Sequence, residues 1–283
     1  EHNCKPDFIN FVYYDTVLAD KRNKSKSTFG FINSMTLNDQ SDGVRCFIRH
    51  LRHQLESWNC KKTPIFVSEW NNTPSQQDLL NDTCYKSCYI TKTILDNYDM
   101  TESLSYWALS DLMPEAPLPE SMLFGGTGLF TVNGLPKSSY YALYLLRHLG
   151  DQFLAKGECW YATRTPADIR IIAYHYRHYS KLYAMGERFE MTETERYTMF
   201  EPAQQQKLSL TIHDTSAEKY LVKEYILNRK SGSLFDMWVN SGAIDPTSQE
   251  ELNLLHARTV PDVHRYYINS SEQTLTIDLS MVL

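Results

Sequence analysis

A short apolar run in the first third of the chain is followed by a carboxylate, an indole and an amide, Glu69, Trp70 and Asn71. The run Ile65–Val67 is typical of a strand buried on both faces, and the residues after Asn71 have the composition of a loop. Barrel enzymes carry their catalytic groups at the carboxyl ends of such strands. Glu69 is therefore a candidate catalytic carboxylate, with Trp70 as an aromatic platform and Asn71 as a hydrogen-bonding amide for a sugar. A solvated glutamate at a strand end is the alternative interpretation.

Further aromatic side chains end the neighbouring predicted strands. Tyr14 closes the segment Phe8–Tyr14, and Tyr106 and Trp107 lie in the segment Ser103–Ser110. Because the carboxyl ends of parallel strands meet at one edge of a sheet, we expect these side chains to lie near Glu69. Trp107 suits either core packing or the floor of a sugar subsite, since aromatic faces match the CH patches of a pyranose.

Strands and helices alternate through the first half of the chain. The expected strands are Phe8–Tyr14, Pro64–Glu69 and Ser103–Ser110. The expected helices are Gly43–Glu56, Ser75–Tyr98, opened by a capping box at Ser75, and Ser138–Leu149. A basic loop, Lys21–Thr28, and a loop rich in Pro and Gly, Met113–Gly128, connect them. This order predicts right-handed βαβ units with parallel pairing.

The pattern changes to short alternating segments near residue 151. The expected strands are Cys159–Thr163, Ile169–Tyr176, Lys207–Ile212, Lys219–Asn228, His264–Asn269 and Thr274–Leu283, with one helix at Ser248–Arg258. Such a series is typical of an antiparallel β-sandwich. We therefore expect an α/β plus all-β chain, with a glycosidase-like barrel part at residues 1–151 and a β-sandwich at residues 152–283.

The composition excludes several classes of function. The chain has 283 residues, 42% of them hydrophobic and 22% charged, and its net charge of −6 gives no footprint for nucleic acid. No run of ~18 apolar residues predicts a membrane span, so we expect no membrane partner. The six cysteines match no zinc pattern, so we expect no metal and no cofactor, and their scatter favours a reducing, cytoplasmic location.

The two ends of the sequence do not resemble natural termini. A predicted strand begins within the first ten residues, with neither a Met nor a signal-peptide pattern before it, and the last residues stop inside an alternating run. We therefore expect a piece of a longer protein.

Four motifs in this order resemble the C-terminal part of glycoside hydrolase family 39, the β-xylosidase family. They are Ser68-Glu69-Trp70-Asn71, Asn81-Asp82-Thr83, Tyr106-Trp107-Ala108-Leu109-Ser110-Asp111 and Phe124-Gly125-Gly126-Thr127-Gly128-Leu129-Phe130. The resemblance spans roughly residues 7 to 151. It implies the C-terminal portion of a (β/α)8 TIM barrel, its last three strands, followed by an antiparallel β-sandwich.

The resemblance also implies a mechanism. The family's Glu-Trp-Asn motif supplies the nucleophile of a retaining glycosidase, which here is Glu69. A retaining mechanism needs a second carboxyl about 5–5.5 Å away. The family places this acid/base in an Asn-Glu-Pro segment, and this sequence contains none. We therefore expect a retaining-glycosidase scaffold for a sugar or short β-glycoside, without its acid/base and without activity when this chain stands alone.

Two departures from the family favour another function. Val12 and Phe124 stand where the family tends to have His, and both changes remove polar sugar contacts. Some AraC-type transcription regulators resemble this arrangement, with a family-39-like barrel after their DNA-binding helices. The alternative is therefore a sugar-sensing domain that does not cleave its ligand.

A partial barrel leaves strand edges unpaired, and unpaired edges invite association. We expect either self-association between copies of the chain or another element of the chain along the edge. The sequence does not name the sugar or the oligomeric state.

Overall fold

The computed structural model describes residues 5–17, 36–113, 119–187, 191–200 and 205–281. The predicted basic loop Lys21–Thr28 lies outside these residues. Among the described residues, no helix combines the length and the apolar character needed to cross a membrane.

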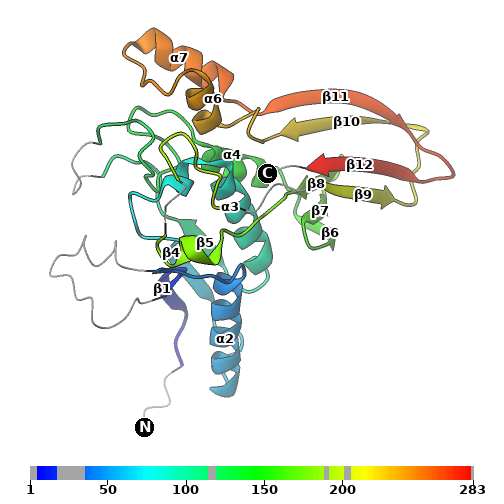
Figure 1. Cartoon of the computed structure of the whole chain (residues 1–283). Coiled ribbons are helices and arrows are strands. Elements are labelled where there is room, and N and C mark those ends of the chain that lie inside the picture. The colour runs from blue at the N-terminus through cyan, green and yellow to red at the C-terminus, as the bar shows by residue number, and fades with distance from the viewer. Residues whose placement is uncertain (1–4, 18–35, 114–118, 188–190, 201–204, 282–283) are drawn as a thin grey trace.

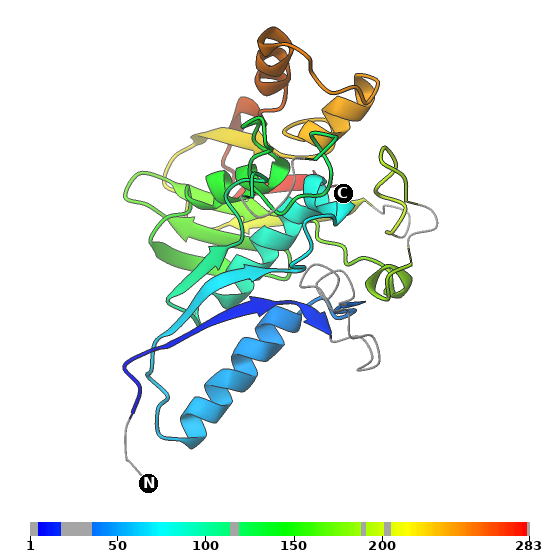
Figure 2. The same ribbon diagram turned by 90° about the vertical axis from the view of Figure 1, so that its left-hand side faces the viewer.

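Three parallel strands form the first sheet (Figures 1 and 2). They are β1 (Ile9–Tyr14), β4 (Ile65–Asn71) and β5 (Ser103–Tyr106), in the order β1-β4-β5. Helix α2 (Gly43–Ser57) connects β1 to β4, and α3 (Cys84–Asn97) connects β4 to β5. The predicted parallel βαβ pairing is confirmed. A short antiparallel pair, β2 (Thr16–Val17) and β3 (Thr36–Leu37), follows β1.

Strand β5 is shorter than predicted: Trp107 still donates its N–H to the Trp70 carbonyl of β4 at 3.1 Å, and the backbone changes partner at Ala108. Leu129 donates its backbone N–H to the Ala108 carbonyl at 2.9 Å, and Phe130 donates to Leu109 at 3.1 Å. Residues 127–131 therefore run along the continuation of β5. This segment pairs with the residues that follow β5 and not with β5 itself, so it extends the sheet without covering the edge of that strand.

The predicted helix Ser75–Tyr98 is wrong in its first turns. The chain forms a 3-10 turn, η1 (Leu79–Asp82), becomes extended at Thr83, and only then begins α3. Asp78, and not Ser75, caps the turn by accepting the Leu80 N–H at 3.1 Å. The interruption turns Asn81 and Asp82 toward buried partners on residues 125–137, and those contacts outweigh local helix propensity.

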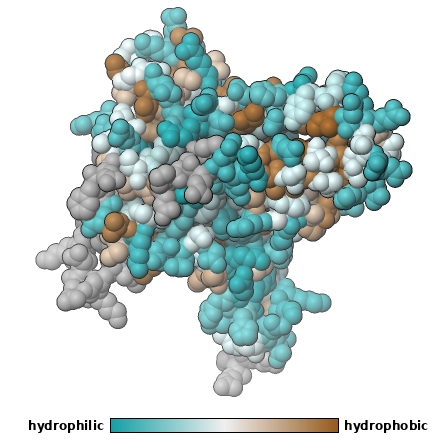
Figure 3. Space-filling view, turned by 45° about the vertical axis from the view of Figure 1, so that its right-hand side comes forward, coloured by the Kyte–Doolittle hydropathy of each residue, from teal (hydrophilic) through white to brown (hydrophobic). Residues whose placement is uncertain are grey.

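The second half is built from antiparallel sheets, as predicted. After α4 (Ser138–Leu146) come three strands in one sheet, β6 (Gln152–Lys156), β7 (Trp160–Arg164) and β8 (Ile169–Ala173). Two ribbons follow, β9 (Gln206–Ile212) with β12 (Leu275–Met281), and β10 (Lys219–Ile226) with β11 (Asp262–Asn269). Both ribbons extend away from the helices (Figure 1), and apolar side chains are exposed along them (Figure 3).

Sequence patterns missed β6 and two short helices. Helix α5 (Lys181–Ala184) follows β8, and α6 (Leu234–Asn240) precedes the predicted helix α7 (Gln249–Arg258). Helix α5 has four residues and α6 has seven, which are too few to show a helical period. Helix α7 begins with a capping box in which Ser248 and Glu251 bond each other's backbone N–H groups.

The main core lies between the parallel sheet and its helices, and it crosses residue 151. Ile48, Ile65 and Ile90 are fully buried there, and Tyr183 and Phe200 from the second half pack with them. A second cluster joins residues from both halves: Met122, Leu123, Leu135, Leu234, Phe235 and Trp238. The two halves thus share apolar cores.

The opposite side of the parallel sheet is exposed, and we call it the open face. Phe8, Val12 and Phe66 lie on it with 57%, 54% and 37% of their surface exposed. Phe8 and Phe66 meet edge to face, with ring centroids 5.8 Å apart. An uncovered inner face is what a partial barrel would present.

The burial of α2 gives a stability prediction. Ile48→Ala should lower the free energy of unfolding by about 2–4 kcal/mol, because the cavity at this fully buried position cannot collapse. Arg49→Ala, at the next and exposed helix position, should change it by less than about 0.5 kcal/mol. Urea unfolding followed by circular dichroism measures both; equal effects would show that α2 is not docked on the sheet.

Candidate functional site

A β-bulge near the end of β4 decides which side chains reach the open face. Val67 pairs with Phe11 and Glu69 pairs with Val12, so Ser68 is the extra residue that the strand register skips. The register on β5 shifts at the same place. Without the extra residue, Glu69 would follow Val67 to the buried side. The bulge places Glu69 on the open face with Val12, as bulges near functional sites often re-aim a side chain.

Glu69 meets Tyr14 across the ends of β4 and β1. The Tyr14 hydroxyl donates a hydrogen bond to Glu69 Oε1, and both side chains are half-buried. Burial and this bond raise the pKa of Tyr14 well above its ordinary range. The phenol therefore stays protonated at neutral pH and continues to donate to the carboxylate.

Three of the residues expected to contact a ligand lie beneath the open face. Trp70 and Asn71 have no exposed surface. The Trp70 ring packs against Tyr106 and Tyr89, with centroids 5.5 and 5.8 Å away. Tyr106 donates its hydroxyl to the Thr127 carbonyl at 3.0 Å. In this packing Trp70 offers no free face to a sugar, and the structure gives it a place in the core.

Asn71 connects the end of β4 to Trp107. Its Nδ2 donates to the Trp107 carbonyl at 2.6 Å, and its Oδ1 accepts from Lys86 Nζ and from the Asn72 N–H, each at 2.8 Å. The Trp107 indole is 38% exposed. The structure therefore brings Tyr14 and Glu69 together and leaves Trp107 partly exposed after β5, the next strand of the sheet, while Asn71 binds the Trp107 backbone carbonyl.

Lys86 is a buried cation that sequence reasoning missed. It lies on α3 with no exposed surface, and its Nζ contacts Asn71 Oδ1 and Asn72 Oδ1. Burial lowers its pKa to about 7. Ten of the fourteen residues of α3 are buried, and a single lysine in such a helix gives no sequence signal that its ammonium group points inward.

Four more charged groups form what we call the buried charge cluster: Asp82, Asp111, Lys137 and Arg196. Lys137 Nζ lies 2.8 Å from a carboxylate oxygen of Asp82 and 2.8 Å from one of Asp111. Arg196 pairs with the other Asp82 oxygen at 2.6 Å. All four side chains are excluded from solvent. Two carboxylates and two cations compensate each other, which is the condition for burying charge.

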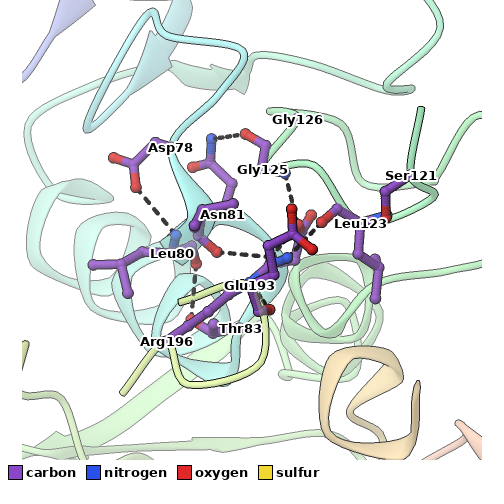
Figure 4. Close-up of polar contacts among 12 residues, drawn as sticks. Asp78, Leu80, Asn81, Thr83, Ser121, Leu123, Gly125, Gly126, Glu193 and Arg196 are labelled. Atoms are coloured by element: carbon purple, nitrogen blue, oxygen red, sulfur yellow. Dashed lines mark hydrogen bonds and ion pairs between the residues drawn. The ribbon is translucent and has the colours of Figure 1, made fainter. Parts of the chain in front are cut away.

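The cluster holds a loop, Gly125–Gly128, at the carboxyl end of the sheet. Gly125 donates its N–H to Asp82 at 2.8 Å, and Gly128 donates to Asp111 at 2.6 Å. Figure 4 shows the Gly125 end of this loop, where the Asn81 side chain donates to the Gly125 carbonyl at 2.8 Å. Lys137 donates to the Gly126 carbonyl at 2.8 Å. Asp111 thus accepts a backbone N–H of this loop and also pairs with Lys137.

Close approach requires glycine in this loop. A Cβ on Gly126 would lie 2.3 Å from the Asp111 carboxylate, and one on Gly128 would lie 2.2 Å from the Asp111 backbone nitrogen. Gly125 also has a φ of +88°. The backbone of this loop is therefore pressed against the charge cluster, and no Gly-Lys-Ser/Thr sequence follows it as in a phosphate loop.

Within the described ranges, no three His, Cys, Asp or Glu side chains are grouped to hold a metal ion. The carboxylates of the charge cluster already accept from lysine, arginine and backbone donors.

The chain belongs to glycosyl hydrolases family 39, whose family model matches residues 2–270. A β-xylosidase from Caldicellulosiruptor saccharolyticus is 37% identical over 90 residues, which is 31% of this chain and 18% of the relative. An uncharacterized HTH-type transcriptional regulator of Staphylococcus aureus is 20% identical over 221 residues, which is 78% of this chain and 28% of the relative.

Solved structures show the same fold. The monomeric β-xylosidase from Caulobacter crescentus CB15 superposes with a TM-score of 0.76 at 21% identity, covering 98% of this chain and 54% of that chain. The family 39 enzyme of Xanthomonas axonopodis pv. citri also gives 0.76, at 18% identity, with 98% and 53% covered. The fold is thus related to that of the family's glycosidase barrels. This chain spans about half the length of those solved chains and less than a third of the curated relatives.

The lowered pKa of Lys86 predicts a pH-dependent stability. Between pH 7 and 10.5 the unfolded chain binds a proton at Lys86 that the native chain does not, so stability rises with pH across this window and is flat below it. Relative to Lys86→Met, the wild-type chain should gain up to about 1.4 kcal/mol per pH unit above pH 7. Urea unfolding of both at pH 6–9 measures this; a constant difference would mean that Lys86 stays charged when buried.

Two glycine substitutions distinguish the stability cost of a steric clash from the stability cost of a positive φ. Gly126→Ala should cost about 3–5 kcal/mol of unfolding free energy, because its methyl group would push the Asp111 carboxylate away from Lys137. Gly134→Ala, where φ is +77° but no atom lies within 4 Å, should cost only about 1 kcal/mol. Thermal and urea unfolding compare them; a cost for Gly126→Ala no larger than that for Gly134→Ala would contradict the packing described.

Proposed function

We propose that this chain carries the nucleophile side of a retaining β-glycosidase site. The observation that supports it best is the Tyr14–Glu69 hydrogen bond at the bulged end of β4, beside the accessible Trp107 on the next strand end. In this proposal Glu69 attacks the anomeric carbon, Tyr14 orients the carboxylate, and the Trp107 indole covers the apolar face of the sugar. The two relatives named β-xylosidases favour a xyloside among short β-glycosides.

The site needs a second carboxyl to complete a retaining reaction. That group protonates the leaving oxygen and then activates water, about 5–5.5 Å from the nucleophile. No Asn-Glu-Pro segment occurs in the sequence. The carboxylates of the charge cluster are committed to Lys137 and Arg196. We therefore propose that this chain binds the sugar but does not turn it over by itself.

The same proposal assigns a barrel part to residues 1–151 and a β-sandwich to residues 152–283. The uncovered side chains of the open face would be buried by additional barrel strands or by a second copy of the chain. Five described cysteines are free thiols, which supports a reducing, cytoplasmic location.

A second candidate function is a sugar-sensing domain of a transcription regulator. The observation that favours it is the extent of the sequence alignments, since that with the regulator covers 78% of this chain and that with the β-xylosidase of Caldicellulosiruptor saccharolyticus covers 31%. Val12 places an apolar side chain, 54% exposed, opposite Glu69 on the open face. In a sensor, Glu69 would accept hydrogen bonds from sugar hydroxyls, and no acid/base would be needed.

The activity prediction concerns the isolated chain. With an activated aryl β-xyloside, whose leaving group needs little protonation, we expect no turnover above that of Glu69→Gln. Without a general base to activate water, the glycosyl-enzyme intermediate is hydrolysed slowly, and loss of such acid–base help lowers a rate by ~10²–10⁴. Turnover by the wild-type chain that disappears in Glu69→Gln would contradict the proposal that this chain is inactive by itself.

The binding prediction concerns Trp107. In titration calorimetry with xylose, xylobiose and arabinose, Trp107→Ala should weaken binding by about tenfold, because the sugar loses its aromatic surface. Trp58→Ala, which removes an indole that is 62% exposed beyond the end of α2, should leave affinity unchanged. No binding at millimolar sugar, or equal effects of both variants, would mean that Trp107 only packs.

A further inference from the structure

Lys86 lies at the start of a chain of contacts that ends at Trp107. Its Nζ is 2.8 Å from Asn71 Oδ1 and also bonds Asn72 Oδ1. Asn71 Nδ2 then donates to the Trp107 carbonyl at 2.6 Å, and the Trp107 N–H donates to the Trp70 carbonyl at 3.1 Å. Every link before the indole is buried, so solvent does not compete for these bonds.

We propose that Lys86 is a positioning residue for sugar binding: it fixes the Asn71 amide so that this amide holds Trp107 in its ligand-contacting place. The proposal deepens the function above and rests on the assignment of Trp107 as a sugar contact. Lys86 touches no ligand itself.

The physical argument is the two-fold ambiguity of a side-chain amide. An asparagine amide can be turned by half a rotation with little change of shape, and only its partners decide which end is oxygen. The Lys86 Nζ keeps N–H donors whether or not it is protonated, so together with the Asn72 N–H it selects the orientation in which Asn71 Oδ1 faces α3. That choice leaves Nδ2 facing the Trp107 carbonyl, where a donor is required. With the amide turned, two oxygens would face each other at hydrogen-bond distance.

The surroundings of Lys86 leave its ammonium group available for this role. Asp78 and Asp82 on the preceding turn raise its pKa and Lys137 lowers it, but its direct polar contacts among the described residues are the two amide oxygens. Its Nζ also lies 5.4 Å from the centre of the Tyr89 ring. A buried lysine whose direct partners are amide oxygens has no contacting carboxylate to offset its desolvation cost. A methionine would fill similar space without that cost. The role that remains for Lys86 is to orient the Asn71 and Asn72 amides.

A double-mutant cycle in xylobiose affinity tests the proposal. Lys86→Met should weaken binding by about tenfold in the wild-type background and should have no further effect in Trp107→Ala, because it acts through Trp107. Lys92→Met is the matched control. Lys92 lies on the same helix, paired with Asp96 at 2.6 Å and away from Asn71, so its loss should leave affinity unchanged.

The outcomes separate this proposal from the proposed function. If Trp107→Ala leaves affinity unchanged, or if wild-type chain binds no xylobiose, both fail. If Trp107→Ala weakens binding and Lys86→Met does not, or if the two effects add, only the role of Lys86 is overturned. Should Lys86→Met not fold, Asn71→Ala removes the same connection from the other end, and effects that add to those of Trp107→Ala overturn the proposal equally.

A readout without ligand supports the cycle. The side-chain NH₂ of Asn71 should exchange slowly with solvent in the wild-type chain and in Lys92→Met, and at least tenfold faster in Lys86→Met, as measured by ¹⁵N-resolved NMR. Equal exchange in folded Lys86→Met and wild type would show that the amide keeps its orientation without the lysine.

Discussion

The pairing of Asp82 with Lys137 and Arg196 is the interaction on which this structure depends most. It joins four segments that are distant in sequence: the turn after β4, the loop Gly125–Gly128, the start of α4, and residues 191–200 of the second half. Arg196 also donates to the Leu123 carbonyl and lies over the Phe235 ring, 4.6 Å from its centre. Each charge is fully buried, so each partner is needed to compensate another. Removing one member would leave an unpaired charge, which typically costs about 3–5 kcal/mol.

Backbone hydrogen bonds connect the charge cluster to the candidate site. The glycine loop is bonded to the cluster on one side, while on the other the Ala108 N–H donates to the Thr127 carbonyl at 3.3 Å and Tyr106 donates to the same carbonyl. The strand end that carries Trp107 is therefore held from below by Asn71 and from the side by the loop. Groups preorganised on rigid elements lose less entropy on binding a ligand, which is the property that the proposed sugar site requires.

Sequence reasoning located the elements because their periodicity is local. The parallel strands and α2 follow from apolar runs and stripes, and Glu69 follows from its place at a strand end. The role of Trp70 could not be read in this way, because the extra residue Ser68 shifts every later side chain of β4 to the other face. Contacts with distant segments cause the break before α3 and the burial of the Lys86 and Arg196 side chains. A single sequence contains no signal for those contacts. The resemblance supplied the family, but burial decided which motif residues can meet a ligand.

Native-state hydrogen exchange of the Gly125 and Gly128 amides tests most directly whether the buried charge cluster fixes the carboxyl end of the sheet. Both N–H groups donate to cluster carboxylates, so they should exchange only through global unfolding, with a free energy close to that from urea unfolding. In Lys137→Met, both should exchange through a local opening while the amides of Ile48 and Ile90 remain protected. Fast exchange of Gly125 and Gly128 in the wild-type chain, with α2 and α3 still protected, would contradict this account.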